Sequence, residues 1–404
     1  MSNSIEGIKS IEDADVSGKT VLVRADLNVP MEGGVVTDTT RIDRFAPTVK
    51  LLVERGAKVA IMSHFGRPKG QRDKKFSLKP VAEALAQALG QEVKFASDCV
   101  GEVAEKAVWA LQPGEVLMLE NLRFYPGETE DDENFARRLA VLGDIYVNDA
   151  FSVSHRAHAS VHAITKFLPS YAGLNLMKEL KALSAALDDP DRPAAALVGG
   201  AKVSTKITVL ENLLPVVDQI IVGGGMANTF LLALGYDVGK SLCEPDFVDT
   251  AKQVMAKAEE NNCEIVLPSD ATCAKEFKAG AEAEVCALDS IPSDSMILDI
   301  GPQSIADLKV RLQNLKTLLW NGPLGAFEVQ PFDKGTVEIA RAAAELTKAG
   351  KLTTVAGGGD TVAALNTAGV TDDFTYVSTA GGAFLEWLEG KELPGVAALK
   401  ASTA

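Results

Sequence analysis

Several apolar runs in the first half of the chain end in arginine or histidine. The runs cover residues 20–23, 58–62, 116–119 and 144–147, and the basic residues that follow them are Arg24, His64, Arg67, Arg123 and Arg156. Guanidinium groups bind carboxylates and phosphates through paired hydrogen bonds. Any one of these arginines alone is readily explained as a solvated surface charge. Four of them at equivalent positions of four strand–helix units favour anion recognition, because unpaired like charges would otherwise repel one another.

A different pattern begins at the middle of the chain. The apolar run that starts at Ala196 ends in Gly199-Gly200, and Lys202 and Lys206 follow it four residues apart. This pattern predicts a buried strand, a turn and a helix whose first turns carry both ammonium groups on one face, toward a phosphate. The alternative interpretation is a tight strand-to-helix turn with solvated lysines.

Glycine clusters end several apolar runs of the second half, at residues 199–200, 223–225, 321–325, 357–361 and 381–382. Glycine lets a backbone approach a pyrophosphate closely and exposes amide N–H groups at a helix N-terminus. A single Gly-Gly is typical of a turn, whereas five converging clusters indicate a nucleotide. No Gly-x-x-x-x-Gly-Lys-Ser/Thr segment occurs, which excludes a Walker-type loop, and no Gly-x-Gly-x-x-Gly follows a strand, which disfavours a dinucleotide site.

Two further sets of polar residues bear on metal binding. Asp360 stands where a helix over residues 361–365 should begin, so it is either an N-cap or a ligand, direct or through water, for Mg²⁺ beside nucleotide phosphates. His155, His158 and His162 fall at helical spacing, but no cysteine lies close and Asp149 is some way off, which disfavours zinc. No Ser-His-Asp or paired-carboxylate constellation supports a hydrolase.

The elements that must position these residues alternate between strand and helix. Near-continuous apolar strands and helical patterns such as residues 78–89 and 132–142 predict a parallel, doubly wound sheet, with ligands beyond the carboxyl ends of its strands. The alternation continues to residues 374–377 and includes residues 296–299 as a strand. A helical pattern over residues 175–189 closes with two prolines, as is typical of a domain junction.

Composition limits the class of protein. A chain of 404 residues with 47% hydrophobic and 24% charged residues suggests a soluble protein of two or three domains. The net charge of -15 argues against nucleic acid or an anionic membrane as the main partner. Five cysteines without a Cys-x-x-Cys pair, and a polar N-terminus without a secretory signal, favour a reduced cytoplasm. The longest uncharged run is interrupted by glycine and polar residues, so a membrane span is not expected.

Nine segments that occur in order along the chain resemble the phosphoglycerate kinase family. They are residues 24–30, 63–68, 120–124, 149–151, 155–160, 199–203, 223–226, 320–325 and 357–361, within a resemblance that runs from about Val21 to Lys391. The resemblance implies reversible phosphoryl transfer between 1,3-bisphosphoglycerate and ADP, giving 3-phosphoglycerate and ATP with Mg²⁺. It also implies a monomer made of two doubly wound, Rossmann-like α/β domains, joined by a helical hinge with a cleft between them.

Carried over by motif, the resemblance implies a phosphoglycerate site of Arg24, Asp26, Asn28, Arg41, His64, Arg67, Arg123 and Arg156. Arg41 would be the catalytic arginine, and the threonines and helical spacing around it place it near a helix start. In the second half, Lys206 would bind nucleotide phosphates, Lys202 would act catalytically on the transferring group, and Glu328 would bind the ribose. The remaining nucleotide residues would be Gly200, Gly224, Asn321, Gly322, Leu324, Gly358, Gly359, Asp360, Thr361, Gly381 and Gly382, with Asp360 associated with the metal.

Two positions depart from the family pattern. Phe65 stands where a smaller aliphatic residue is common, and Ala380 replaces a glycine in Ser378-Thr-Ala-Gly-Gly382. The methyl group of alanine restricts positive φ, which disfavours a phosphate contact by that backbone position.

The implied organisation places phosphoglycerate binding in residues 1–175, a hinge in residues 176–189 and nucleotide binding in residues 190–385. Residues 386–404 would return to the N-terminal domain. A carboxylate acceptor is already deprotonated, so the chemistry would need no general base and would rest on positioning, charge stabilisation and domain closure. Two alternatives stay open at this point: an oxidoreductase with a nucleotide cofactor, and a non-catalytic protein that binds phosphorylated metabolites.

Overall fold

The apolar runs of each half build a parallel sheet. The computed structural model describes residues 5–402, and within this range the chain forms two units. One unit comprises residues 5–181 and 392–402, and the other comprises residues 182–391. Each contains a six-stranded sheet in which all strand pairs are parallel. The prediction of an α/β protein with two parallel-sheet domains is confirmed.

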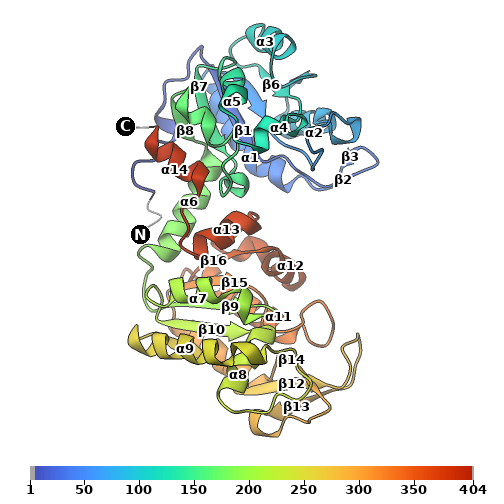
Figure 1. Ribbon diagram of the computed structural model, residues 1–404, viewed down its shortest axis with the longest axis vertical. Helices are drawn as coiled ribbons and strands as arrows, with labels where there is room; N and C mark the ends of the chain where they lie inside the picture. The colour runs from blue at the N-terminus through green and yellow to red at the C-terminus, as the bar shows by residue number, and fades with distance from the viewer. Residues whose placement is uncertain (1–4, 403–404) are drawn as a thin grey trace. The chain divides into compact units, whose positions relative to one another are not determined.

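The N-terminal unit has the strand order β5-β6-β4-β1-β7-β8. These strands are β1 (Thr20–Ala25), β4 (Lys58–Met62), β5 (Val93–Ala96), β6 (Val116–Leu119), β7 (Ile145–Asp149) and β8 (Ser170–Ala172). Its helices are α1 (Thr40–Glu54), α2 (Lys79–Leu89), α3 (Glu102–Trp109), α4 (Pro126–Thr129), α5 (Glu133–Ala140) and α14 (Pro394–Ala401), and a hairpin consists of β2 (Met31–Glu32) and β3 (Val35–Val36). The C-terminal helix α14 packs against β8, as Figure 1 shows in red.

The chain order of the strands creates a switch point beside β1. From β1 the chain moves first to β4 on one side of the sheet and later returns to β7 on the other side. Arg24 at the end of β1 is in register with Met62 of β4 and with Asn148 of β7. Loops diverge at such a point, and the space beyond the carboxyl ends of the strands receives ligands.

The C-terminal unit repeats this architecture with the order β11-β10-β9-β15-β16-β17. These strands are β9 (Ala194–Gly199), β10 (Gln219–Gly223), β11 (Glu264–Val266), β15 (Thr317–Asn321), β16 (Thr353–Gly357) and β17 (Tyr376–Ser378). Its helices are α7 (Ile207–Leu213), α8 (Gly224–Ala233), α9 (Val248–Glu260), α10 (Pro302–Asn314), α11 (Lys334–Lys348), α12 (Gly359–Ala368) and α13 (Gly381–Leu388). The switch point lies between β9 and β15.

Residues 296–299 do form a strand, but its place in the parallel alternation was predicted wrongly. Strand β14 (Met296–Ile300) pairs antiparallel with β12 (Asp270–Ala274), which also pairs with β13 (Ala283–Ala287). The three strands form a separate small sheet (Figure 1). A short apolar run has the same appearance in either kind of sheet, so only pairing partners distinguish them.

The boundary between the two units falls within helix α6 (Leu174–Leu187), which corresponds to the helical pattern predicted over residues 175–189. Among the described residues, no helix combines the length and apolar character needed to cross a bilayer.

Candidate functional site

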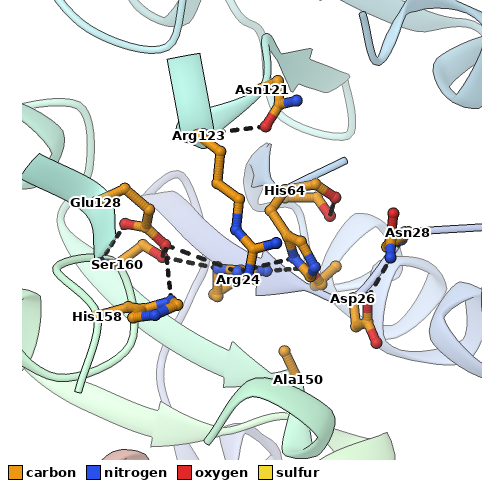
Figure 2. Close-up of polar contacts among 12 residues, drawn as sticks. Arg24, Asp26, Asn28, His64, Asn121, Arg123, Glu128, Ala150, His158 and Ser160 are labelled. Atoms are coloured by element: carbon orange, nitrogen blue, oxygen red, sulfur yellow. Dashed lines mark hydrogen bonds and ion pairs between the residues drawn. The ribbon is translucent and has the colours of Figure 1, made fainter. Parts of the chain in front are cut away.

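The predicted anion site lies at the carboxyl edge of the N-terminal sheet. Arg24 is the last but one residue of β1, His64 follows β4, and Arg123 lies in the short 3-10 turn η3 (Leu122–Phe124) after β6 (Figure 2). The loops of three adjacent strands therefore bring these side chains to one place, because parallel strands end at the same edge.

Arg24 is fully buried, and all three of its nitrogens are engaged. Nε donates to the Ser160 hydroxyl at 2.8 Å, Nη1 donates to the carbonyl of Ala25, and Nη2 donates to Nδ1 of His64 at 3.2 Å. Its buried counter-charge is Glu128, whose Oε1 lies 3.8 Å from Nη2. A buried guanidinium needs such partners to offset the cost of leaving water. The contacts fix the plane of the guanidinium within the site.

Arg41 and Asp26 form a second cluster at this edge. Arg41 is the second residue of α1, near the start of a helix as the sequence predicts. Its Nη1 donates to Oδ2 of Asp26 at 2.7 Å and to the carbonyl of Asn28 at 3.1 Å. Ser152 also donates to Asp26. The amide oxygen of Asn28 accepts from the backbone N–H of Gly66 at 2.9 Å, which ties the β1 loop to the β4 loop.

The positive charges of this edge act on one another. Burial, together with the nearby charges of Arg24, Arg156 and Arg67, lowers the pKa of Arg123 to about 10, against a raising effect of Glu128. Arg67 and Arg156 are themselves exposed. Neighbouring cations repel one another, and a bound anion offsets this electrostatic repulsion. The structure thus brings together the arginines that the sequence singled out.

Two histidines in the site are held neutral. Burial, followed by the charge of Arg24, lowers the pKa of His64 well below its usual value. Burial, again followed by Arg24, lowers the pKa of His158 to about 4, and its Nδ1 lies 3.9 Å from Oε1 of Glu128. Neither ring is an imidazolium at neutral pH.

The state of His158 makes folding dependent on pH. In the unfolded chain its imidazole takes up a proton near pH 6.5, whereas in the folded protein it stays neutral down to about pH 4. Between pH 6.5 and pH 4 the unfolded state therefore binds more protons than the folded state. The contribution of neutral His158 to the free energy of unfolding is present above pH 6.5 and is lost as the pH falls toward 4. The free energy of unfolding falls as the pH is lowered from 7 to 4, and we expect His158→Gln to make this fall smaller by about 2 kcal/mol. Urea unfolding of both proteins between pH 4 and 7 measures the difference, and parallel pH profiles would contradict it.

In the C-terminal unit the lysine pair departs from its predicted placement. Lys202 precedes the 3-10 turn η6 (Val203–Thr205), and Lys206 is the N-cap of α7, so the predicted helix carrying both lysines in its first turns is wrong. The 3-10 turn delays the start of the helix. Lys202 is exposed, whereas Lys206 is half-buried and donates to the amide oxygen of Asn321 at the end of β15. Burial lowers the pKa of Lys206, against the raising effects of Glu389 and Asp360.

Glycines let the loops beyond β9 and β15 approach each other very closely. A Cβ added at Gly199 would lie 1.9 Å from the carbonyl oxygen of Pro323, and one added at Gly322 would lie 2.2 Å from the carbonyl oxygen of Gly199. Gly224 has φ +68°, and a Cβ there would lie 2.7 Å from the carbonyl oxygen of Gly200. Any side chain would force these backbones apart.

A cavity of about 330 Å³ opens beside these glycines. Apolar side chains from α8, from β14 and from the loops that follow α8, β11, β12 and β15 form much of its wall; they include Leu231, Leu242, Pro268, Phe277, Met296, Leu298 and Leu324. Gly200, Gly224, Glu328 and Asp360 also line it. Such a cavity suits a flat heterocycle with a polar group at one end. Sequence reasoning identified Leu324 and missed the other apolar residues, which come from segments distant in sequence and follow no local motif.

Asp360 is not an N-cap. Helix α12 begins at Gly359, and its N-cap is Gly358, whose φ of +102° lets the chain turn into the helix earlier than predicted. Asp360 therefore lies exposed in the first turn. The neighbouring Thr361 is buried and accepts a 2.8 Å hydrogen bond from the backbone N–H of Gly322.

The remaining glycines of the predicted site start a second helix. Gly381 and Gly382 form the exposed first residues of α13. Ala380 is its N-cap with φ −100°, so the alanine at this departure from the family pattern causes no backbone strain. Phe65, the other departure, is buried in the apolar core of the N-terminal unit.

The three histidines at helical spacing have different partners. His162 lies 2.6 Å from Asp131, His155 accepts from Nε of Arg156, and His158 lies near Glu128. Over residues 5–402, no group of three or more His, Cys, Asp or Glu side chains is placed to hold a metal ion.

A known protein family matches nearly the whole chain. The family model described as Phosphoglycerate kinase matches residues 11–391. The chain belongs to the phosphoglycerate kinase family. It is 59% identical to the phosphoglycerate kinase of Methylorubrum extorquens (strain PA1) over 394 residues, which cover 97% of this chain and 98% of that protein. It is 58% identical to that of Chelativorans sp. (strain BNC1) over 395 residues, covering 98% and 99%.

Solved structures of phosphoglycerate kinases have the same fold. The structure from Coxiella burnetii matches with a TM-score of 0.92 at 44% identity, covering 98% of this chain and 100% of that one. The structure from Pyrococcus horikoshii OT3 matches with a TM-score of 0.80 at 32% identity, covering 98% and 99%. The family resemblance drawn from the nine segments is confirmed. The oxidoreductase and the non-catalytic binding protein are not supported by these matches.

Proposed function

We infer that this protein is a phosphotransferase with a carboxyl group as acceptor. It catalyses the reversible, glycolytic transfer of a phosphoryl group between 1,3-bisphosphoglycerate and ADP, which yields 3-phosphoglycerate and ATP. The observation that carries this inference is the presence of two chemically distinct sites at equivalent sheet edges. One gathers arginines around a buried histidine, and the other joins glycine turns and a half-buried lysine to an apolar cavity.

The arginine-rich edge binds the phosphoglycerate. Arg24 and His64 supply hydrogen-bond donors from buried positions, and Arg123 adds a partly buried guanidinium. The exposed Arg67 and Arg156 add further positive charge at the edge of the site. The loop that contains Asp26 and Asn28 organises this edge, since both residues hold neighbouring backbone or side-chain groups. Phosphate and carboxylate groups are the partners that guanidinium forks bind best.

The glycine-rich edge binds the nucleotide. The apolar cavity receives the base, and Glu328 at its wall receives the ribose hydroxyls. Lys206 and the amide N–H groups at the start of α12 and α13 receive the phosphates, because helix N-termini attract anions. Asn321 positions Lys206 by accepting a hydrogen bond from its ammonium group, and its amide nitrogen in turn donates to the carbonyl of Gly357 at 2.8 Å.

Asp360 fits a role in holding Mg²⁺ with the nucleotide. It is an exposed carboxylate that lines the nucleotide cavity and lies close enough to Lys206 to affect its pKa. Mg²⁺ is commonly bound by one or two carboxylates together with substrate phosphates and water, so a single aspartate suffices. When bound, the ion neutralises charge on the phosphates.

The chemistry rests on position and charge rather than on proton transfer. The carboxylate oxygen of 3-phosphoglycerate attacks the γ-phosphorus of ATP, the bond from that phosphorus to the β-γ bridging oxygen breaks, and ADP leaves. The attacking carboxylate is already ionised, so no side chain must act as a general base. Arg41 and Lys202 stabilise charge on the transferring phosphoryl oxygens. Transfer requires the two sites to meet, so we propose that the units close on each other during each turnover and exclude water.

A coupled assay tests this function. Protein incubated with ATP, Mg²⁺ and 3-phosphoglycerate should produce ADP, whereas glycerate and acetate in place of 3-phosphoglycerate should leave ADP production at least about a hundredfold lower, since neither can engage the arginines through a phosphate. Removing Mg²⁺ with a chelator should abolish turnover. Equal turnover with acetate would contradict the acceptor assignment, and full turnover without divalent cations would contradict the role of Mg²⁺.

We also propose that the enzyme acts as a cytoplasmic monomer. All five cysteines carry free thiols, which suits a reducing compartment. Sedimentation at micromolar concentration gives the mass, and a value near twice the 42.7 kDa of one chain would contradict the monomer.

A further inference from the structure

We propose that Ser160 and Glu128 are positioning residues of the phosphoglycerate site, and that they act through Arg24 to hold His64 as a neutral imidazole with its proton on Nε2. This inference deepens the proposed function, because it assumes that Arg24 and His64 contact the phosphoglycerate. Neither Ser160 nor Glu128 contacts the phosphoglycerate in this proposal. Both lie on the side of Arg24 that is away from His64, as Figure 2 shows.

The direction of each hydrogen bond around Arg24 follows from chemistry. A guanidinium carries N–H donors and no acceptor, so every partner of Arg24 must accept. Nη2 lies 3.2 Å from Nδ1 of His64, and Nδ1 must therefore present its lone pair. A histidine that accepts at Nδ1 and is neutral carries its single proton on Nε2.

A doubly protonated His64 is disfavoured on the same grounds. Its Nδ1–H would face an N–H of Arg24, and its charge would add to those that already surround the ring. The charged and titratable groups near it are Arg24 from β1, Arg41 from α1, Arg123 from η3 and His158. His64 is therefore an uncharged donor whose protonation does not change near neutral pH, which also agrees with the lowered pKa described above.

Ser160 sets the plane of Arg24. Its Oγ accepts from Nε of Arg24 at 2.8 Å, so its own hydroxyl proton is directed elsewhere, to Oε1 of Glu128 at 2.6 Å. The backbone around the residue is held as well: its N–H donates to Oε2 of Glu128 at 3.0 Å, and its carbonyl accepts from the hydroxyl of Tyr146 at 2.7 Å. Ser160 has no freedom to rotate away.

Glu128 anchors this chain of hydrogen bonds. It is fully buried on α4, and both carboxylate oxygens accept from Ser160 while one lies 3.8 Å from Nη2 of Arg24. Glu128, Ser160, Arg24 and His64 are thus joined in one chain of hydrogen bonds, in which Ser160 donates to Glu128 and Arg24 donates both to Ser160 and to His64. Polar networks of this kind are rigid when every member is satisfied. The buried carboxylate of Glu128 therefore holds Ser160 and Arg24 in place, and Arg24 in turn determines which nitrogen of His64 carries the proton.

The decisive measurement is the protonation of His64, read from two-bond ¹H–¹⁵N spectra of protein with ¹⁵N-labelled histidine. The chain has four histidines, and His64→Gln assigns the signal by its disappearance. In the wild-type protein at pH 7 we expect the Nε2–H tautomer. A wild-type His64 with the proton on Nδ1, or with both nitrogens protonated, would overturn the proposal without the need for any further variant.

Ser160→Ala removes the link between Glu128 and Arg24. We expect the His64 signal to become a mixture of tautomers and the KM for 3-phosphoglycerate to rise about tenfold, while the KM for ATP changes by less than about twofold. Ser160→Thr keeps the hydroxyl and should restore both properties. A Ser160→Ala protein with wild-type tautomer and wild-type KM would also overturn the proposal.

Ser170→Ala is the matched control, because Ser170 is another buried serine of the same unit and donates to the carbonyl of Leu168. It should leave the tautomer and both KM values unchanged; a rise in the KM for 3-phosphoglycerate equal to that of Ser160→Ala would overturn the specific role of Ser160. If the wild-type protein showed the Nε2–H tautomer but no turnover with 3-phosphoglycerate, the hydrogen-bond series would be supported and the proposed function would fail.

Discussion

Replacing Arg41 with alanine is expected to lower kcat about a thousandfold while the affinity for ATP stays within about twofold of the wild type. The side chain is oriented by its ion pair with Asp26 and by the carbonyl of Asn28, both bound through Nη1. Arginine has five donors, so this anchoring is compatible with a further contact to the transferring group. Charge develops there only during transfer, so the loss should be seen in turnover rather than in nucleotide binding.

Steady-state kinetics together with calorimetric titration of ATP separates the two quantities. Arg72→Ala serves as the control, since Arg72 is an exposed arginine of the same unit that pairs with Asp98. It should leave kcat unchanged. Arg41→Lys should fall between wild type and Arg41→Ala, because lysine keeps the charge and loses the planar fork. Unchanged turnover in Arg41→Ala would remove Arg41 from the mechanism.

The second large effect concerns the backbone of the nucleotide site. Gly199→Ala is expected to destabilise the C-terminal unit by about 3 kcal/mol and to lower its Tm by about 10 °C. The new methyl group would lie 1.9 Å from the carbonyl oxygen of Pro323, so the loops after β9 and β15 would have to separate. The KM for ATP should rise about tenfold, because these loops form part of the cavity wall.

Scanning calorimetry measures the loss, and Gly359→Ala provides the comparison for stability. Gly359 also begins a nucleotide-site segment, but a Cβ there meets no atom within 4 Å and its backbone is not left-handed. Alanine at this helical position should leave the Tm unchanged or raise it slightly. If Gly199→Ala unfolded at the wild-type temperature, the close approach of the two loops would not be essential.

The sequence was a good guide where chemistry is local to a strand end. Arg24, His64 and Arg123 each follow an apolar run, and parallel strands bring such ends to one edge whatever the loops do. In the structure Arg24 donates to His64, and the charges of Arg24 and Arg123 both act on the pKa of that histidine. Their individual roles in binding stay predictions, as does the catalytic role of Arg41.

Local sequence patterns gave wrong predictions where the placement of a side chain depends on the residue at which a helix begins. Lys202 and Lys206 were expected on one face of a helix, but a 3-10 turn separates Lys202 from α7. Asp360 was a candidate N-cap, but the left-handed φ of Gly358 starts α12 earlier. Helix boundaries depend on a few backbone angles that residue spacing does not determine.

By itself, the sequence determined the fold class, the family and the list of groups able to bind anions, because strand periodicity, glycine clusters and charged residues are properties of short segments. Only the tertiary structure decided how these groups are held. Glu128 and Ser160 are 32 residues apart, and the walls of the nucleotide cavity come from α8 and the small antiparallel sheet. Such contacts depend on which distant segments pack together, and the direction of a hydrogen bond exists only once donor and acceptor have met.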